Sequence, residues 1–542
     1  MIKIVTVEKM RQIEAAADAS GISYATMMEN AGRATALRVL EILAEIEDPW
    51  VTILIGPGNN GGDGLVAGRI IAQESDAHVR LYMLKHRSES DDNFAAVQQA
   101  GLFVAYAEDD RDFRVLRNLV GSAHLVIDAL FGIGLRLPLR DNVVKVLRNV
   151  HQALNDSTQF EAPTYILPAR PMPNRQRRRT FVMAVDCPSG LDCDTGEIDR
   201  YTLTADETIT FIAAKPGLLT FPGARAVGQL SVAQIGVPDK LKELAEEKFV
   251  LADAHYVRRR LPARTLNSHK GTYGKALIVA GSQNYVGASA LAAEAAYRVG
   301  AGLVTVATSQ PVLASLTSRL TEPTWLPLPD EGGMIDATAT NIVRDTFASV
   351  DGLLLGPGLG QAEVTQKFIE QLLSSTDVDW PSMVIDADGL NLLGKIDRWW
   401  TMLPEHTIVT PHPGEMARLA AVSTSEVQTN RQVLAHEKSA EWGVVVLLKG
   451  AHTLIAAPDG RIVALPFKTD ALATAGTGDV LAGIIVGLLA QGVESFDAAV
   501  VGGYLHGVAG EYAARQHGNS RSVIAGDVLR ALPTALTLLE NA

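Results

Sequence analysis

The chain has 542 residues, of which 47% are hydrophobic and 20% charged, and its formal net charge is −13. A length well above about 250–300 residues indicates more than one domain, and the composition is that of a globular protein rather than a disordered one. The acidic balance argues against a nucleic-acid-binding protein, whose surface should be basic.

The number of cysteines and the length of the apolar runs indicate the cellular compartment of the protein. The two cysteines, Cys187 and Cys193, do not form a C-x-x-C pair, and so few in a long chain fit a reducing compartment. The first ten residues lack the apolar core of a secretory signal. The longest apolar stretch, 480–490, is too short to span a bilayer and predicts a buried helix. We therefore expect a cytoplasmic protein with no membrane partner.

The first half of the chain alternates between predicted helices and short buried strands. Apolar residues at helical spacing run from 6 to 46, and a further helix is predicted at 65–72. Such alternation is typical of an α/β fold with a parallel sheet covered on both faces. Between 155 and 180 the pattern lapses into prolines and a short basic run, which predicts a loop insertion that binds no nucleic acid. The predicted strands are 51–55, 79–84, 125–127 and 181–185.

A second α/β series follows a charged region at 236–267, which we expect to be helical and without a strand. We place the domain boundary near residue 245, with domains at 1–245 and 246–542. The halves share no convincing sequence repeat. The strands predicted in the second half are 276–280, 303–307, 352–355, 383–385, 407–409 and 444–448, and the helices are 288–299, 479–490 and 498–515.

A glycine-rich segment, G-P-G-N-N-G-G-D-G at 56–64, follows the first predicted strand and opens a helix. Glycines let the backbone approach a phosphate, and a helix N-terminus supplies free N–H donors. No acidic residue closes the second strand, where Lys85, His86 and Arg87 stand instead, so an ordinary dinucleotide-binding dehydrogenase is disfavoured. A glycine-rich turn without a ligand is the plainer alternative.

Two more predicted strands end in polar residues, at 128–134 and at 186–196. The carboxyl ends of parallel strands meet at one edge of a sheet, so these residues should lie near the glycine segment. Asn60, Asp128 and Ser189 would then offer oxygen ligands to one hard cation, although each alone is more simply a capping or turn residue.

These three segments resemble the NAD(P)H-hydrate epimerase domain over about residues 1–235. The resemblance implies a Rossmann-like three-layer fold that interconverts the R and S hydrates of NADH and NADPH (NADHX and NADPHX), and a K⁺ ion held by Asn60, Asp128 and Ser189. Asp186 is the candidate general acid/base, because epimerisation breaks and remakes a bond at one carbon. The chain departs from the family in its 155–180 insertion and in Cys187. The implied hydrate contacts are Asn59, Asn60, Gly61, Gly62, Asp63, Gly132, Ile133, Gly134, Leu135, Arg136, Leu137, Pro138 and Asp186.

In the second half, A-G-T-G-D at 475–479 precedes the apolar helix. Small residues at a helix start can cradle developing negative charge, and Asp479 could take a proton from a hydroxyl. An N-cap aspartate is the alternative. Glycine-rich segments at 356–360, 410–415 and 449–453 follow other strands. Lys449 suits a phosphate but could be an exposed lysine, and His412 could be a turn residue.

The A-G-T-G-D, K-G-A-H-T and T-P-H-P-G-E segments resemble the ribokinase-like superfamily and, more narrowly, the ADP/ATP-dependent NAD(P)H-hydrate dehydratases, over about residues 250–535. The resemblance implies that a nucleotide, for which we expect ADP over ATP, phosphorylates the hydrate and that phosphate then leaves. Mg²⁺ is expected, with no ligand assigned. Asp479 is the implied base. The implied nucleotide contacts are Lys449, Gly450, Ala451, His452, Thr453 and Gly478, and the implied hydrate contacts are Ala288, Gly358, His412 and Asp479.

Together the halves predict a bifunctional repair enzyme in which the epimerase supplies the epimer that a stereospecific dehydratase can clear. A small-molecule kinase acting on a vitamin-type alcohol is the nearest alternative, and the T-P-H-P-G-E segment and the first domain argue against it. A binding module without turnover is disfavoured because the candidate acidic residues are all present. We expect small-molecule substrates and assembly as a homo-oligomer.

Overall fold

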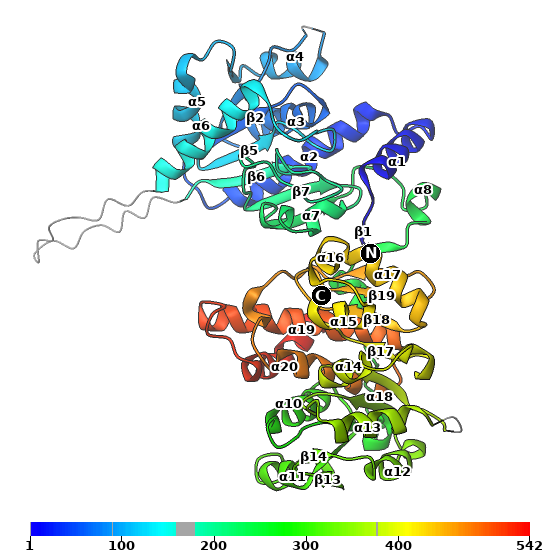
Figure 1. Cartoon of the computed structure of the whole chain (residues 1–542). Coiled ribbons are helices and arrows are strands. Elements are labelled where there is room, and N and C mark those ends of the chain that lie inside the picture. Colours follow the sequence, from blue (N-terminus) through cyan, green and yellow to red (C-terminus); the bar gives the residue numbers. More distant parts are fainter. Residues whose placement is uncertain (1, 89, 159–178, 376–377) are drawn as a thin grey trace, which may run out of the picture. The chain divides into compact units, whose positions relative to one another are not determined.

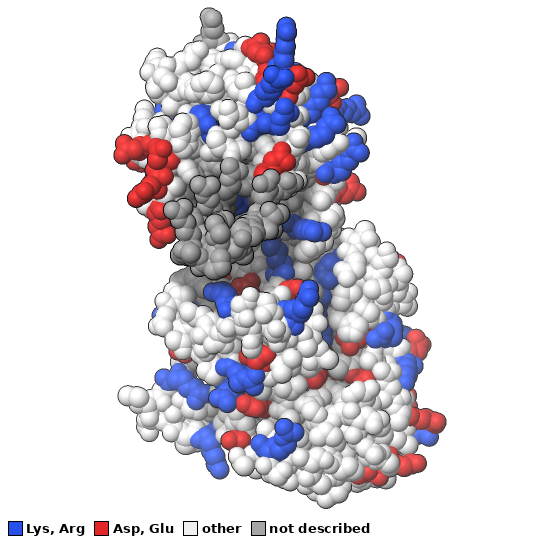
Figure 2. Space-filling view, turned by 90° about the vertical axis from the view of Figure 1, so that its left-hand side faces the viewer, with Lys and Arg blue, Asp and Glu red and all other residues white. Residues whose placement is uncertain are grey.

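The computed structural model describes residues 2–88, 90–158, 179–375 and 378–542, and it divides into two compact units, Ile2–Glu247 and Lys248–Ala542. Most of the insertion predicted at 155–180, with most of its basic run, lies outside the described residues. On the face shown in Figure 2, basic side chains lie among acidic ones, so charge is not segregated there.

The described part of the first unit holds a seven-stranded parallel sheet in the order β4-β3-β2-β5-β6-β7-β8 (Figure 1). The order reverses between β2 and β5, and ligands of such sheets bind where the strand order reverses. The predicted α/β fold is confirmed. The strands of this sheet are β2 (Trp50–Ile55), β3 (His78–Met83), β4 (Phe103–Tyr106), β5 (Leu125–Ala129), β6 (Phe181–Val185), β7 (Glu207–Phe211) and β8 (Gln229–Ala233), and the short β1 (Ile2–Lys3) is not part of it.

Helices cover both faces of this sheet and make three layers. Neighbouring strand residues alternate between two cores: Ile53 packs with α1, α2 and α3, whereas Leu54 packs with α5 and α6. The helices are α1 (Val7–Ala19), α2 (Tyr24–Leu43), α3 (Asn59–Glu74), α4 (Asp92–Gln99), α5 (Arg114–Gly121), α6 (Asp141–Thr158), α7 (Pro216–Leu219) and α8 (Lys242–Ala245).

Two helix boundaries differ from the sequence prediction. The helical stretch expected at 6–46 is broken into α1 and α2, because Gly21 takes a positive φ of 102° and Ser23 caps the second helix. The helix expected from 65 begins at Asn59 instead. Its glycines are packing residues: a Cβ on Gly64 would lie 2.6 Å from the Ala129 Cβ, so glycine lets α3 approach the sheet.

The second unit holds a larger sheet with the order β9-β20-β19-β18-β17-β16-β15-β10-β11-β12. Its strands are parallel from β12 to β18, and β18, β19 and β20 are antiparallel. The expectation of no strand in 236–267 is wrong, because Phe249–Leu251 pairs with β20. The strands of this sheet are β9 (Phe249–Leu251), β10 (Lys275–Val279), β11 (Leu303–Ser309), β12 (Thr324–Leu328), β15 (Gly352–Leu355), β16 (Ser382–Ile385), β17 (Ile408–Val409), β18 (Val445–Leu448), β19 (Leu454–Ala456) and β20 (Ile462–Ala464), while β13 (Asp330–Glu331) and β14 (Met334–Ile335) pair separately.

The apolar helix α18 lies at the centre of this unit and is buried on nearly every side, as the sequence predicts. No helix among the described residues combines the length and the apolar character that crossing a bilayer would require. The helices are α9 (Ala254–Arg258), α10 (Val286–Arg298), α11 (Gln310–Leu316), α12 (Ala339–Arg344), α13 (Glu363–Leu373), α14 (Asp388–Leu393), α15 (Pro413–Ala420), α16 (Thr424–Thr429), α17 (Arg431–Trp442), α18 (Thr477–Ala490), α19 (Ser495–His517) and α20 (Ala525–Glu540).

The contact between α10 and α18 predicts a stability effect. A Cβ on Gly483 would meet the Ala292 backbone, 2.7 Å from its Cα. We expect Gly483→Ala to lower the free energy of unfolding of this unit by about 2 kcal/mol, although alanine is the better helix former by about 1 kcal/mol. Gly287→Ala in α10 is the matched control, because nothing lies within 4 Å of the added Cβ. Calorimetric unfolding measures both, and equal stability of the two variants would contradict the close packing.

Candidate active sites

In the first unit, the ends of β2, β5 and β6 open into one cavity of about 970 Å³. Asn59, Asn60 and Asp63 reach it from the start of α3, and Asp186 reaches it from the end of β6. α1 and α2 close the opposite side. The remaining lining residues include Arg11, Glu14, Tyr24, Met28, Phe131, Gly132, Ile133, Gly134, Leu135, Phe211 and Lys215.

The structure brings Asn60 and Asp186 together across Gly132. A Cβ on Gly132 would lie 2.7 Å from Asp186 Oδ2 and 3.4 Å from Asn60 Cγ. Only glycine leaves both side chains in place. The glycine-rich loop after β5 therefore keeps a carboxylate and an amide at one spot on the cavity wall.

Asp186 is held by a buried lysine that the sequence analysis missed. Lys215 Nζ lies 2.7 Å from Asp186 Oδ1, and its side chain is 1% exposed. The Thr210 hydroxyl also donates to Oδ1, at 3.1 Å, and the Ile133 N–H donates to Oδ2, at 3.2 Å. A lysine at the end of an apolar strand gives no sequence signal for this pairing.

Two further carboxyl groups line the same cavity. Burial raises the pKa of Asp63 well above its usual value, and the nearby charges of Asp186 and Glu14 raise it further. Burial, then Asp186, also raises the pKa of Glu14, which the sequence analysis did not identify as a site residue. The cavity thus places two carboxyl groups with raised pKa beside an aspartate that is paired with a buried lysine.

Of the three predicted cation ligands, two are hydrogen-bonded to each other and the third, an amide, has no hydrogen-bond partner. Asp128 is fully buried and accepts from the Ser189 hydroxyl (2.6 Å) and the Ser189 N–H (2.8 Å). Asn60 is also buried, yet neither its amide oxygen nor its amide nitrogen has a hydrogen-bond partner. Within the described ranges, no group of three or more His, Cys, Asp or Glu side chains is arranged to hold a metal ion.

The other predicted hydrate contacts are spread more widely. Gly61 and Gly62 face inward. An added Cβ on Gly61 would meet the Gly56 carbonyl, and one on Gly62 would lie 2.6 Å from the Met28 sulfur. Arg136 lines a smaller adjoining cavity of about 150 Å³. Leu137 and Pro138 line neither cavity.

Arg87 positions the glycine segment. Its Nη2 donates to the carbonyl oxygens of Gly56 (2.9 Å) and Gly58 (2.7 Å), and its Nη1 lies 2.7 Å from Asp91. Basic residues follow β3 where a dinucleotide-binding fold has the acidic residue that binds ribose. One of these basic residues, Arg87, instead supports the glycine segment.

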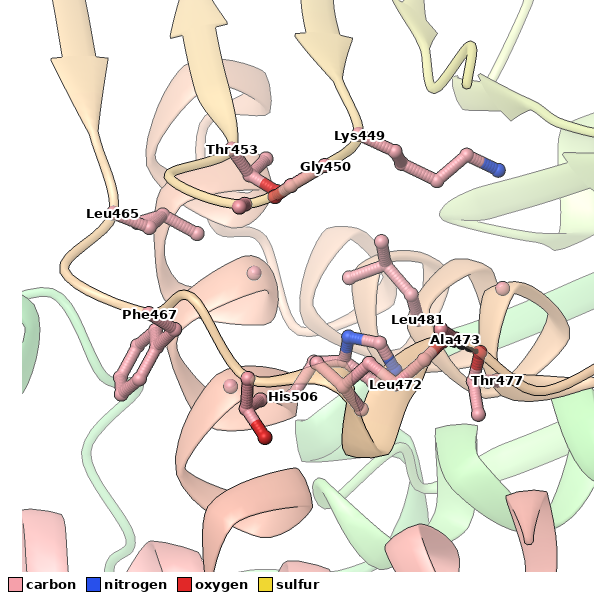
Figure 3. A pocket seen from close by; sticks show the side chains of 15 residues that line it. Lys449, Gly450, Thr453, Leu465, Phe467, Leu472, Ala473, Thr477, Leu481 and His506 are labelled. Atoms are coloured by element: carbon pink, nitrogen blue, oxygen red, sulfur yellow. Dashed lines mark hydrogen bonds between the residues drawn. The ribbon is translucent and has the colours of Figure 1, made fainter. Parts of the chain in front are cut away.

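In the second unit, a cavity of about 210 Å³ lies between the β18–β19 loop, the start of α18 and α19 (Figure 3). Of the predicted nucleotide contacts, five line it: Lys449, Gly450, Ala451, Thr453 and Gly478. His452 does not, because its ring is buried with Nδ1 at 3.0 Å from the Leu465 carbonyl. The sequence analysis missed the other wall, formed by Leu465, Phe467, Leu472, Leu481 and His506.

Lys449 is engaged by acidic side chains rather than freely exposed. Its Nζ lies 2.6 Å from Asp386 Oδ1 and 3.9 Å from Glu415 Oε2, and Asp386 also accepts from the Thr410 hydroxyl at 2.7 Å. A Cβ on Gly478 would lie 3.5 Å from Lys449 Nζ, so the ammonium reaches the start of α18. The sequence analysis missed Asp386 because it follows a strand without any glycine motif.

Asp479 lies in the first turn of α18, and its pKa is raised. Burial raises its pKa to about 7, with the charge of Asp386 adding to the shift and that of Lys449 opposing it. A carboxyl with a pKa near neutrality is suited to accept a proton in a reaction.

His412 acts as a helix cap. Its Nδ1 accepts from the N–H groups of Gly414 (3.0 Å) and Glu415 (3.4 Å), while Glu415 accepts from the His412 N–H at 2.8 Å. Half of its side chain remains exposed. Ala288 and Gly358 lie against each other, since a Cβ on Gly358 would be 2.9 Å from the Ala288 Cβ.

Comparison with known proteins assigns both halves. Residues 24–217 match the family described as YjeF-related protein N-terminus, and residues 276–534 match the NAD(P)H-hydrate dehydratase family. A bifunctional NAD(P)H-hydrate repair enzyme from Moorella thermoacetica is 38% identical, covering 99% of this chain and 97% of that protein. The chain belongs to the family of bifunctional NAD(P)H-hydrate repair enzymes. The family predicted from the motifs is confirmed.

Two further relatives match the whole chain and its second half, respectively. The bifunctional NAD(P)H-hydrate repair enzyme of Leishmania infantum is 32% identical, covering 97% of this chain and 92% of that protein. A solved structure of an ADP/ATP-dependent NAD(P)H-hydrate dehydratase from Bacillus subtilis is 32% identical, covering 54% of this chain and 98% of its own, with a TM-score of 0.46.

The Arg87 contacts predict a local change in dynamics. In Arg87→Met the Gly56 and Gly58 carbonyls lose their charged donor, so amide hydrogen exchange across 56–61 should accelerate at least about tenfold. Arg69→Met is the control, because Arg69 lies on α3 but pairs with Glu29 instead of the loop. Exchange measured by mass spectrometry tests this, and unchanged exchange in Arg87→Met would show that the loop holds itself.

Proposed function

We propose that the first unit interconverts the R and S hydrates of NADH and NADPH, and that the second unit dehydrates the S hydrate at the expense of an adenine nucleotide. The observation that carries this proposal is a strand-end cavity in each unit. Asp63 and Asp186 line the cavity of the first unit, and Lys449 and Gly478 line that of the second, where Asp479 directly follows Gly478. Similarity to the repair enzymes over nearly the whole chain supports it.

In the epimerase site, Asp186 is the proposed acid/base. Its Oδ1 accepts from both Lys215 and Thr210, whereas Oδ2 accepts from the Ile133 N–H and keeps a second lone pair, so Oδ2 is the oxygen that can reach a substrate. Inversion at one carbon requires a proton to be given and another to be taken back. Asp63 and Glu14, whose pKa values burial raises, can carry the second proton.

Asn60, Asp128 and Ser189 are the proposed K⁺ ligands. The fit is supported by Asn60, whose amide oxygen is buried without a partner, since oxygen atoms are the ligands of hard cations. K⁺ would supply positive charge beside the glycine segment, where a phosphate-bearing substrate binds. Asp128 and Ser189 hold each other in place for this role.

In the dehydratase site, the nucleotide would lie in the cavity of Figure 3, with its phosphates toward Lys449 and Gly478. Asp479 takes the proton of the substrate hydroxyl, and the oxygen attacks the terminal phosphoryl group, whose bond to the nucleotide breaks so that ADP leaves as AMP (or ATP as ADP). Phosphate then leaves as the neighbouring ring carbon loses a proton, which restores the double bond. Mg²⁺ would neutralise phosphate charge, and we assign it no ligand.

We further propose ADP rather than ATP as the donor, and a homo-oligomeric state in the cytoplasm. Incubation with NADHX and each nucleotide, followed by the absorbance of regenerated NADH, tests the whole function. Absence of NADH together with accumulation of a phosphorylated alcohol from another substrate would instead indicate a small-molecule kinase.

Replacing the proposed dehydratase base should separate the activities. We expect Asp479→Asn to lower dehydration by about a thousandfold while epimerisation is unchanged. In the wild-type enzyme, dehydration should fall as the pH drops below about 7, because Asp479 with a pKa of about 7 becomes protonated and cannot accept a proton. Loss of both activities in a folded variant would contradict two separate sites.

The K⁺ site predicts a change in salt dependence. Asn60→Ala removes no hydrogen bond, because its amide has no partner, so the fold should persist. We expect the K⁺ concentration for half-maximal epimerisation to rise by about tenfold or more. Asn59→Ala is the neighbouring control and should keep the wild-type K⁺ dependence whatever its rate. An unchanged K⁺ response in Asn60→Ala would remove Asn60 from the ligand set.

A further inference from the structure

We propose that Lys215 is a positioning residue of epimerisation: its buried ammonium holds one oxygen of Asp186 and leaves the other oxygen to the substrate. This inference rests on the proposed epimerase function of the site. It adds a residue outside the three motifs, from a segment that follows β7.

All the donor capacity of Lys215 is used within the protein. Nζ lies 2.7 Å from Asp186 Oδ1, 2.6 Å from the Thr210 hydroxyl and 3.4 Å from the Phe211 carbonyl. An ammonium has three protons, and these three acceptors account for all of them. Lys215 therefore has no proton left for a substrate, and it acts through Asp186 rather than as an acid.

The backbone places the two partners from different strands. Asp186 directly follows β6 with a positive φ of 65°, and its N–H donates to the Ile209 carbonyl of β7 at 2.7 Å. A left-handed aspartate persists only where its surroundings hold it. Lys215 and Thr210, at and after the end of β7, hydrogen-bond to one oxygen of Asp186. The Ile133 N–H, in the loop after β5, donates to the other oxygen.

Charge balance in the cavity gives the ammonium its importance. Asp186, Glu14 and Asp63 all interact with the buried ammonium of Lys215. Arg11 also lowers the pKa of Glu14, Arg87 also lowers that of Asp63, and Cys187 and Cys193 are further charge partners of Lys215. Burial alone would lower the pKa of Lys215, but the charge and hydrogen bond of Asp186 raise it. Without this cation, Asp186 would be a buried carboxyl beside Glu14 and Asp63 with no positive partner on its Oδ1.

The decisive comparison is between Lys215→Met and Thr210→Val. Lys215→Met keeps the length of the side chain but removes the charge, so kcat for epimerisation should fall by about 10³-fold with KM nearly unchanged. The acidic limb of its pH–rate profile should move to higher pH, because the variant lacks the positive charge that favours the ionised form of the neighbouring carboxyl group. Thr210→Val removes two hydrogen bonds, one to Asp186 and one from Lys215, but keeps the ammonium, so it should lose at most about tenfold and keep the wild-type profile.

A second variant separates this role from a folding defect. Lys215→Ala leaves a space beside Asp186, and methylamine added as its cation should restore at least about tenfold of the lost rate, whereas tetramethylammonium, which cannot donate a hydrogen bond, should not. Dehydration by the other unit and hydrate binding by the variant confirm that the chain is folded.

Two results would overturn the proposal. One is near wild-type epimerisation by Lys215→Met, and the other is a loss of rate with an unmoved pH profile and no rescue of Lys215→Ala by methylamine. Failure of the proposed function itself is distinguishable, because the wild-type enzyme would then not epimerise the hydrate at all.

Discussion

A lysine held against an aspartate at the carboxyl ends of parallel strands is the interaction on which each site depends. Asp186 pairs with Lys215 in the first unit, and Asp386 pairs with Lys449 in the second. A carboxylate removed from water keeps its charge only when it is paired. In the first unit the paired group is the proposed acid/base itself. In the second, the pair stands beside Asp479, whose pKa burial then raises to about 7.

Much of the fold could be predicted because its signals are local. Short apolar runs ending in glycine or aspartate marked the strands that carry the sites, and parallel strand ends must meet, so Asp128 and Ser189 were expected together. Strands such as Phe249–Leu251 were missed, because three residues show no periodicity and depend on pairing with a partner distant in sequence.

The unpredicted site residues share a physical reason. Lys215, Glu14 and Asp386 lie in no motif, and each acquires its role from a neighbour on another element. His452 shows the converse: it lies inside a motif, yet its ring bonds to Leu465 and points away from the cavity. Likewise Gly61 leaves room for the Gly56 carbonyl and the Arg87 side chain, a role that its place in a glycine-rich motif does not reveal.

The most direct test of the central claim, two independent chemistries on one chain, is complementation on pure (R)-NADHX with ADP. Asp186→Asn alone and Asp479→Asn alone should each fail to regenerate NADH above the rate without protein. An equal mixture of the two variants should regenerate it, because one protein epimerises the hydrate and the other dehydrates it. No NADH from the mixture, with both variants folded, would contradict the account.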